Sequence, residues 1–454
     1  MIEQTILNMI SKVKSMLSNE PYLGEVFENC YRDTLEKTIT MKEDSTAYVI
    51  TGDIPAMWLR DSAAQLRPYL PLTPKDPEIT ELIAAVVRRQ FQCINIDPYA
   101  NAFNETANGA CWSHDEPACS PWVWERKYEI DSLCYPLQLA WLLWKSSGYT
   151  GHFDRNFING AKKILKVFRT EQHHEEKSDY YFRRENTYFH DTLSRDGHGN
   201  LVKSGIGLIW SGFRPSDDAC TFGYLIPSNM FAVVVLRYLE EIAREVLKKK
   251  NVNTLTGENN FQNEEPYSLI KETTSLTEEA DFLVKEAVAL ADEIYEAIES
   301  IGIVEKEGFG KIYAYETDGY GQYNLMDDAN IPSLLSMKYL GYVGKNPEIA
   351  ENTRRFILSE GNPYFYRGTA ASGIGSPHTP VCNIWHMALA MQGITSDSPE
   401  EKLRMLKLMT ATDAGCGMMH ESFHMDDPTQ FSRSWFSWAN AMYCHLVMDY
   451  LKLI

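Results

Sequence analysis

Long amphipathic segments with helical spacing recur along most of this chain, and they constrain its fold more than any other feature. The segments at 78–91, 228–248 and 434–451 carry apolar residues every three or four positions, as helices that pack one face into a core do. A fourth segment begins where Ser275 and Glu278 form a capping box, and it is expected to continue to Ile298. The pattern predicts a protein of roughly a dozen helices.

Predicted strands are few and short, at 48–51, 180–183 and 312–315, so a parallel α/β architecture is not expected. The fold class is therefore all-α. We expect an (α/α)6 barrel, in which outer helices surround inner ones, with a few short strands in the loops that build a site at one mouth.

No Pro- or Ser-rich linker divides the 454 residues, so the sequence predicts a single domain over 1–454. The segment at 251–266 is polar and rich in asparagine, which predicts a surface insertion between two helices.

A strong excess of acidic residues limits the partners that the chain can bind. Its 43 Lys and Arg against 62 Asp and Glu leave a formal charge of −19, so neither nucleic acid nor an anionic membrane surface is an expected partner. No run approaches the roughly 18 apolar residues of a membrane span. A neutral or cationic partner is expected instead.

The cysteines and the first residues of the chain predict a cytoplasmic location. The nine cysteines are an odd number without a C-x-x-C pair of metal-site spacing, and most lie in apolar surroundings, where a free thiol packs as a small hydrophobe. Cys111 and Cys119 could form a disulfide within one loop, but a reducing compartment is favoured. Residues 1–19 lack the apolar core of a signal peptide.

Polar and aromatic side chains crowd the loop at 51–62, TGDIPAMWLRDS, directly before a helix. Asp53, Arg60 and Asp61 can hydrogen-bond hydroxyl groups, and the Trp58 indole offers a flat apolar face to a sugar ring. The alternative is a buried loop in which Arg60 pairs with Asp53 or Asp61 for structural reasons. Similar loops recur before other helical segments and favour a polyhydroxylated ligand; they lie at 122–131, 211–220, 326–330, 373–380 and 419–424.

Two of these loops hold carboxylates that could cleave a glycosidic bond, a reaction that needs a proton donor and either a nucleophile or an activated water. Asp217 and Asp218 are adjacent, so burial and the neighbouring charge would raise the pKa of whichever faces the cleft. The alternative is that 216–218 caps a helix N-terminus. Glu421 lies in a loop of small residues between two histidines, where an ionised carboxylate could activate water.

Residues 420–424 also match H-E-x-x-H, the zinc-protease signature in which two histidines one helical turn apart bind the metal. That interpretation requires a long helix, whereas Gly415, Gly417 and Pro428 leave room for little more than a turn. No glutamate follows Glu421 as a third ligand. A zinc site is therefore disfavoured, and the sequence predicts no metal and no cofactor.

Considered together, these loops make the chain resemble glycoside hydrolase family 125, the exo-α-1,6-mannosidases. The resemblance runs nearly end to end and implies an (α/α)6 barrel and a metal-independent, inverting hydrolase that removes non-reducing terminal mannose from α-mannosides and N-glycan-type oligosaccharides. The motifs that carry it are TGDIPAMWLRDS at 51, IDPYANAFN at 96, SPWVWERKYEIDSLCYP at 120, WSGFRPSDDAC at 210, GYLIPSNMFA at 223, MDDANIPSLL at 326, GIGSPHTP at 373 and MHESFHMDDPTQFSRSWFSW at 419.

The resemblance also implies roles for individual residues, with Asp217 as general acid and Glu421 as general base. The residues expected to bind a mannose-containing oligosaccharide are Asp53, Trp58, Arg60, Asp61, Asp131, Arg214, Asp218 and His378. Two alternatives stay open, a sugar epimerase or isomerase on the same barrel and a non-catalytic glycan-binding protein. A cytoplasmic location would make short imported oligosaccharides the substrates.

Overall fold

The computed structural model describes residues 2–256 and 266–454, and helices dominate this part of the chain. The main helices are α1 (Ile2–Met16), α2 (Pro21–Asp33), α3 (Leu59–Ala64), α4 (Pro77–Ile96), α5 (Ile130–Ser147), α6 (Arg155–Glu171), α9 (Ile226–Thr256), α10 (Pro266–Ile301), α11 (Met337–Leu340), α12 (Pro347–Ile357), α13 (His386–Ile394), α14 (Pro399–Ala411) and α15 (Ser437–Tyr450). Shorter or irregular turns are η1 (Thr34–Thr38), η2 (Arg67–Leu72), α7 (His174–Lys177), η3 (Phe189–Asp191) and α8 (Ser194–Gly197).

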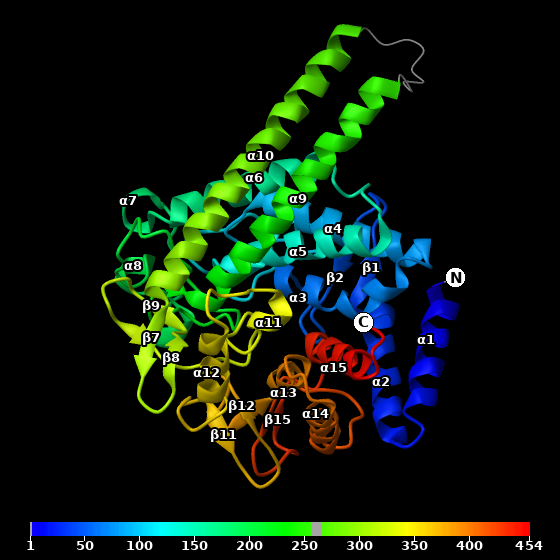
Figure 1. The fold of residues 1–454 in the computed structure, drawn as a ribbon, viewed down its shortest axis with the longest axis vertical. Coiled ribbons are helices and arrows are strands. Elements are labelled where there is room, and N and C mark those ends of the chain that lie inside the picture. Colours follow the sequence, from blue (N-terminus) through cyan, green and yellow to red (C-terminus); the bar gives the residue numbers. More distant parts are fainter. Residues whose placement is uncertain (1, 257–265) are drawn as a thin grey trace.

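Inner and outer helices alternate along the chain, which is the (α/α)6 arrangement that the sequence predicts. The inner helices are α3, α5, α9, α11, α13 and α15, and neighbouring pairs such as α3 with α5 and α5 with α9 pack together. Helices α13 and α15 are buried over most of their length, as helices without a polar face should be. The outer helices α2, α4, α6, α10, α12 and α14 surround them (Figure 1).

Helix α2 packs against α15, so the two ends of the helical ring meet. Helices α9 and α10 pack along each other and project well beyond the rest of the molecule (Figure 1). This pair gives the molecule its elongated outline.

Three-stranded antiparallel sheets lie where loops lead into inner helices. They hold together loops that are distant in sequence, because β3, β6 and β13 run directly into α3, α9 and α13 while their partners come from elsewhere. The sheets are β3 (Met57–Trp58), β4 (Ala102–Phe103) and β5 (Val123–Glu125); β6 (Tyr224–Leu225), β9 (Glu316–Thr317) and β10 (Tyr323–Asn324); and β13 (Asn383–Trp385), β14 (Ser422–His424) and β15 (Phe431–Ser432).

Two-stranded hairpins complete the strands of the described residues. They are β1 (Ile39–Met41) with β2 (Ala47–Val49), β7 (Ile303–Lys306) with β8 (Gly310–Tyr313), and β11 (Phe365–Arg367) with β12 (Ser372–Ile374). All of these pairs are antiparallel.

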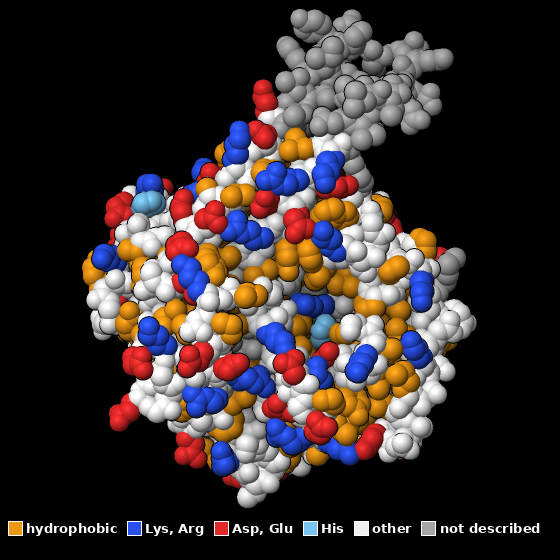
Figure 2. All heavy atoms as spheres, viewed as in Figure 1, with side chains coloured by type: hydrophobic (Ala, Val, Ile, Leu, Met, Phe, Trp, Pro, Cys, Tyr) orange, Lys and Arg blue, Asp and Glu red, His pale blue; other side chains and the backbone are white. Residues whose placement is uncertain are grey.

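One apolar core runs through the helical rings, and Trp210, Trp385 and Trp438 are among its largest fully buried side chains. On the face seen in Figure 2, acidic and basic side chains are intermixed. None of the described helices combines the length and the apolar character that crossing a membrane requires.

Most of the predicted helices are confirmed. The segments at 78–91 and 228–248 lie within α4 and α9, and the segment at 434–451 corresponds to α15, which begins at Ser437. The predicted helix start at Ser275 is wrong, because α10 already begins at Pro266, a residue whose fixed φ suits the first helical turn.

The other predictions have mixed outcomes. Strands at 48–51 and 312–315 overlap β2 and β8, but the strand at 180–183 is wrong: only Arg183 forms an isolated bridge there, while the neighbouring aromatic side chains pack into the core.

Residues 251–256 of the expected insertion continue α9, and 257–265 lie outside the described residues. All nine cysteines are free thiols, so the loop disulfide between Cys111 and Cys119 is not formed.

Candidate active site

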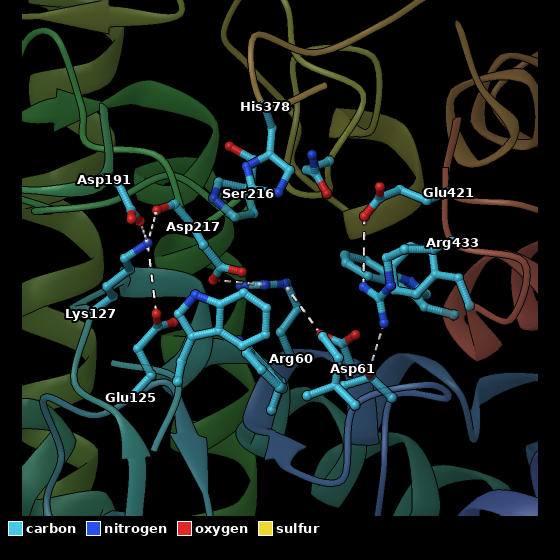
Figure 3. A pocket seen from close by; sticks show the side chains of 18 of the residues that line it. Arg60, Asp61, Glu125, Lys127, Asp191, Ser216, Asp217, His378, Glu421 and Arg433 are labelled. Atoms are coloured by element: carbon cyan, nitrogen blue, oxygen red, sulfur yellow. Dashed lines mark hydrogen bonds and ion pairs between the residues drawn. The ribbon is translucent and has the colours of Figure 1, made fainter. Parts of the chain in front are cut away.

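A cavity of about 210 Å³ opens where the small sheets lead into the inner helices. In Figure 3, Asp217 and Glu421 lie on opposite sides of it, with Arg60 and Asp61 between them. The structure thus brings together carboxylates that are 204 residues apart in the sequence (421 minus 217). The sequence-predicted residues that line the cavity are Trp58, Arg60, Asp61, Asp217, His378 and Glu421.

A tight loop holds Asp217 at the cavity wall. The Asp217 N–H donates to the carbonyl oxygen of Arg214 at 2.9 Å, and the Arg214 N–H donates to the carbonyl oxygen of Asp218 at 2.8 Å. The backbone of Asp217 is left-handed, with a φ of 68°, a conformation that aspartate tolerates better than most residues. The helix N-cap considered for this aspartate pair is wrong, because α9 begins only at Ile226.

The carboxyl group of Asp217 is partly open to the cavity, with 24% of its side chain exposed. Its Oδ1 accepts hydrogen bonds from Asn101 at 3.0 Å and from Arg60 at 3.4 Å. Burial acts to raise the pKa of Asp217, but the charges of Arg60 and Lys127 and a hydrogen bond from Glu129 outweigh it and lower the pKa. A general acid must hold a proton near neutral pH, so Asp217 could act as one only if a neighbour supplied that proton.

Arg60 is buried and forms ion pairs with four carboxyl groups. Asp61 and Asp131 each lie 3.5 Å from its nitrogens, Asp217 lies at 3.4 Å, and Glu129 is in shorter contact. Burial raises the pKa of Asp61 and that of Asp131 to about 6, although Arg60 opposes the shift. The structural pairing of Arg60 with Asp61 is therefore present, and both side chains also line the cavity. Asp131 does not line it and lies against Arg60 instead.

Glu421 is held from the side opposite Asp217 (Figure 3). The hydroxyl of Ser432 donates to its Oε2 at 2.8 Å, and Arg433 lies 3.6 Å from its Oε1. Asp53 accepts hydrogen bonds from Arg433 at 2.5 and 3.0 Å and does not line the cavity. The structure therefore places Asp53 behind Arg433, a cavity residue that sequence analysis missed.

His378 lines the cavity near both candidate catalytic carboxylates. Its Nδ1 donates to Asp218 at 2.9 Å, so Asp218 positions the ring without lining the cavity itself. Burial acts to lower the pKa of His378, but the hydrogen bond and charge of Asp218, with the charges of Glu421 and Asp217, raise it to about 9. His378 therefore carries a positive charge at neutral pH.

Arg214 also lies behind the wall rather than in it. Its Nε donates to Glu316 of β9 at 2.6 Å, and another guanidinium nitrogen donates to Thr221 at 3.2 Å. These contacts tie the loop of Asp217 to a sheet, so Arg214 is a support of the loop and not a residue of the cavity lining.

One wall of the cavity carries four charged side chains that sequence analysis did not identify. Lys127 donates to Asp191 at 2.6 Å, and Arg184 donates to Glu125 and to Asp191, each at 2.8 Å. All four side chains line the cavity. The motif at 120–136 signals polar residues there, but its pairing with a separate loop appears only in the fold.

Aromatic rings complete the lining. Trp58 is nearly buried, whereas Trp112 is 58% exposed and therefore lies at the opening of the cavity. Such rings offer apolar faces to sugar rings. The remaining aromatic lining consists of Trp385, Phe436 and Trp438.

The H-E-x-x-H segment does not have the helical conformation that a zinc protease requires. Its last three residues form β14, paired with β13 and β15, so His420 and His424 are not one helical turn apart. The His420 ring stacks on Phe431 at 3.8 Å, and its Nε2 hydrogen-bonds the carbonyl oxygen of Asp413 at 3.1 Å. The segment therefore belongs to the sheet that carries Glu421, and the backbone does not arrange the two histidines as a zinc site.

Comparisons with known proteins identify the family of this chain. The sequence model of a family described as metal-independent alpha-mannosidase (GH125) matches residues 20–448. A solved structure from Streptococcus pneumoniae, a metal-independent alpha mannosidase in a non-productive complex with α-1,6-mannobiose, is 45% identical, with a TM-score of 0.88 over 99% of this chain and 98% of that chain.

Two further comparisons extend the range of relatives. The meiotically up-regulated gene 157 protein of Schizosaccharomyces pombe is 36% identical over 99% of this chain and 86% of that protein. A solved glycosidase structure shares only 12% identity, with a TM-score of 0.52 over 95% of this chain and 98% of that chain, which shows a common fold alone.

Proposed function

This chain belongs to the metal-independent α-mannosidases of glycoside hydrolase family 125, and we propose that it is an inverting, exo-acting α-1,6-mannosidase. The α-1,6 linkage is supported by the α-1,6-mannobiose bound to the Streptococcus pneumoniae relative. Exo action is supported by the cavity, whose lining includes the buried Arg60, Asp61 and Trp438. A terminal mannose can enter such a cavity, whereas the interior of a glycan chain could not pass through it.

The observation that carries the mechanism is that Asp217 and Glu421 face one cavity from opposite sides (Figure 3). In an inverting hydrolase one carboxyl group protonates the leaving oxygen while the other activates water, and the two stand about 6.5–9.5 Å apart to admit that water. Asp217 acts as the acid. Glu421 acts as the base, because Ser432 and Arg433 both contact its carboxylate and fix its orientation.

The remaining lining residues bind and orient the terminal mannose. Arg60 and Asp61 lie between the two catalytic carboxylates, where they can hydrogen-bond its hydroxyl groups (Figure 3). Trp58 offers an apolar face to the ring, and Trp112 at the opening can stack on the next sugar.

The alternative functions fit this site less well. A sugar epimerase or isomerase would favour paired histidines in the cleft, whereas His378 is the one histidine in the described lining. A glycan-binding protein would keep the aromatic rings without needing Asp217 and Glu421 on opposite sides.

A panel of α-1,2-, α-1,3- and α-1,6-mannobiose tests activity, sugar and linkage together. We expect release of mannose from the α-1,6 isomer in preference to the other two. Proton NMR early in the reaction should show β-mannose accumulating first, because a single displacement inverts the α-linkage. Initial accumulation of α-mannose would contradict the role of Glu421 and would require a nucleophile within about 5–5.5 Å of the acid.

The histidine segment permits a test of metal independence. The variant His424→Ala should keep activity within about twofold of the unaltered enzyme, because this side chain is absent from the cavity lining. His378→Ala, which does remove a lining residue, is the matched control and should lose activity. EDTA should leave turnover unchanged; inactivation by EDTA that added zinc reverses would refute the assignment.

A further inference from the structure

One buried guanidinium faces an excess of carboxyl groups beside the cavity. Arg60 pairs with Asp61, Glu129, Asp131 and Asp217, so full ionisation would set four negative charges against one positive charge. Arg60 and all of its partners except Asp217 are buried, and uncompensated charge is strongly unfavourable there. At least one of these carboxyl groups must therefore keep its proton at neutral pH.

The neighbouring cations do not remove this excess, because each has carboxylate partners of its own. Lys127 pairs with Asp191, Arg433 pairs with Asp53, and His378 pairs with Asp218. Several charged and titratable groups face the pair of Glu129 and Asp217. They are Arg60 and Asp61 of α3, Lys127 of the loop before α5, Asp131 of the first turn of α5, His378 of the 373–380 loop, and Cys220.

The contacts of Glu129 make it the carboxyl group best placed to hold this proton. Glu129 contacts Nη1 of Arg60 and Asp217 contacts Nη2, so the two carboxyl groups lie side by side on one guanidinium. Their mutual hydrogen bond raises the pKa of Glu129 and lowers that of Asp217, and it requires a proton because two ionised carboxylates have no hydrogen to donate. Glu129 Oε2 contacts Arg60 and accepts a hydrogen bond from Ser132 at 2.7 Å. Its Oε1 is buried and accepts no hydrogen bond from the described residues, so Oε1 can carry the proton.

We propose that Glu129 and Asp217 share one proton, and that Glu129 is a positioning residue which stores the proton that Asp217 delivers. Glu129 is only 1% exposed and does not line the cavity, so it cannot touch the substrate. The inference rests on the proposed function, in which Asp217 is the general acid. It explains how a carboxyl group next to Arg60 and Lys127 can act as an acid near neutral pH.

The proton balance of the cycle is simple. The proton passes from Glu129 to Asp217 and then to the glycosidic oxygen, which keeps the electron pair of the broken carbon–oxygen bond. The attacking water gives one proton to Glu421 and its hydroxide to the anomeric carbon. Glu421 then releases a proton to solvent, and the pair of Glu129 and Asp217 takes one back.

Glu129→Gln tests this assignment, because the amide keeps the size and the hydrogen bond but has no transferable proton. We expect kcat/KM for α-1,6-mannobiose to fall about 10²-fold at neutral pH. The kcat/KM for an activated aryl α-mannoside, whose leaving group departs without a proton, should fall by less than about tenfold. The basic limb of the pH profile should move to lower pH by about one to three units, because Arg60 and Lys127 favour the ionised form of an unassisted Asp217.

Two further variants separate proton storage from a structural role. Asp131→Asn removes another carboxylate partner of Arg60, and any loss should be equal on both substrates. Because the charge of Asp131 helps to raise the pKa of Glu129, the basic limb should move to lower pH, but less than in Glu129→Gln. Glu129→Asp retains an acidic group. Its activity on mannobiose and the pH of its basic limb should therefore lie between those of Glu129→Gln and those of the unaltered enzyme. If Glu129→Gln does not fold, as a melting curve would reveal, Glu129→Asp decides: equal losses on both substrates would overturn the proposal.

Equal losses in a folded Glu129→Gln enzyme, with an unmoved basic limb, would also overturn it. Failure of the proposed function is distinguishable, because Asp217→Asn would then retain activity on mannobiose. If Asp217→Asn behaves as an acid knockout and Glu129→Gln does not shift the profile, only the shared proton is refuted.

Discussion

Replacing Asp217 with asparagine is expected to lower the turnover of α-1,6-mannobiose by about 10²–10⁴-fold while leaving substrate binding nearly unchanged. The amide keeps the shape of the side chain and can still pack beside Arg60, but it cannot give a proton to the leaving oxygen. An activated aryl α-mannoside needs little help from an acid, so its turnover should fall much less. Steady-state kinetics on the two substrates measure the difference.

Asp218→Asn is the matched control for this experiment. Asp218 is the adjacent residue, but its carboxylate holds His378 and does not line the cavity. Its replacement should lower the turnover of both substrates by a similar factor. If Asp218→Asn instead showed the dependence on the leaving group while Asp217→Asn stayed active, the choice between the two aspartates would be wrong.

Replacing Glu421 with glutamine should lower turnover of both substrates by about 10²–10⁴-fold, because water must be activated whatever the leaving group. This equal loss is the kinetic opposite of the pattern expected for Asp217→Asn. The comparison therefore assigns acid and base separately, with the same two substrates and the same assay.

Ser432→Ala provides the graded control on this side of the cavity. It removes the hydrogen bond of 2.8 Å to Glu421 but leaves the carboxylate and its contact with Arg433. A hydrogen bond to a charged group contributes about 1.5–3 kcal/mol, so we expect a loss of roughly tenfold or more, smaller than that of Glu421→Gln. A Glu421→Gln enzyme that kept its activity would contradict the base assignment.

Much of the fold could be predicted from the sequence, because helix formation leaves a local signal. The apolar spacing at 78–91 and 228–248 identifies α4 and α9, since residues three or four apart share one helical face. The signal was weaker at helix boundaries: α10 begins at Pro266 and not at the capping box of Ser275, because nothing in the local sequence there prevents the helix from starting earlier. The aromatic segment at 180–183 resembled a strand because burial and strand pairing select the same side chains.

The sequence by itself also determined which residue types stand at the site. Loops with carboxylates, arginine and tryptophan before successive helices already indicated a sugar ligand, and Trp58, Arg60, Asp61, Asp217 and Glu421 all line the cavity. Residue type limits chemistry directly, since a carboxyl group can transfer a proton wherever it is placed.

Only the tertiary structure decided which of these residues face the cavity and which support it. Asp53 contacts Arg433, Asp218 contacts His378, and Arg214 contacts Glu316, so none of the three lines the cavity. It also placed Glu129 beside Asp217, although 88 residues separate them (217 minus 129). The pKa of a carboxyl group depends on burial and on charges within a few ångströms, and those neighbours come from segments that meet only when the barrel has formed.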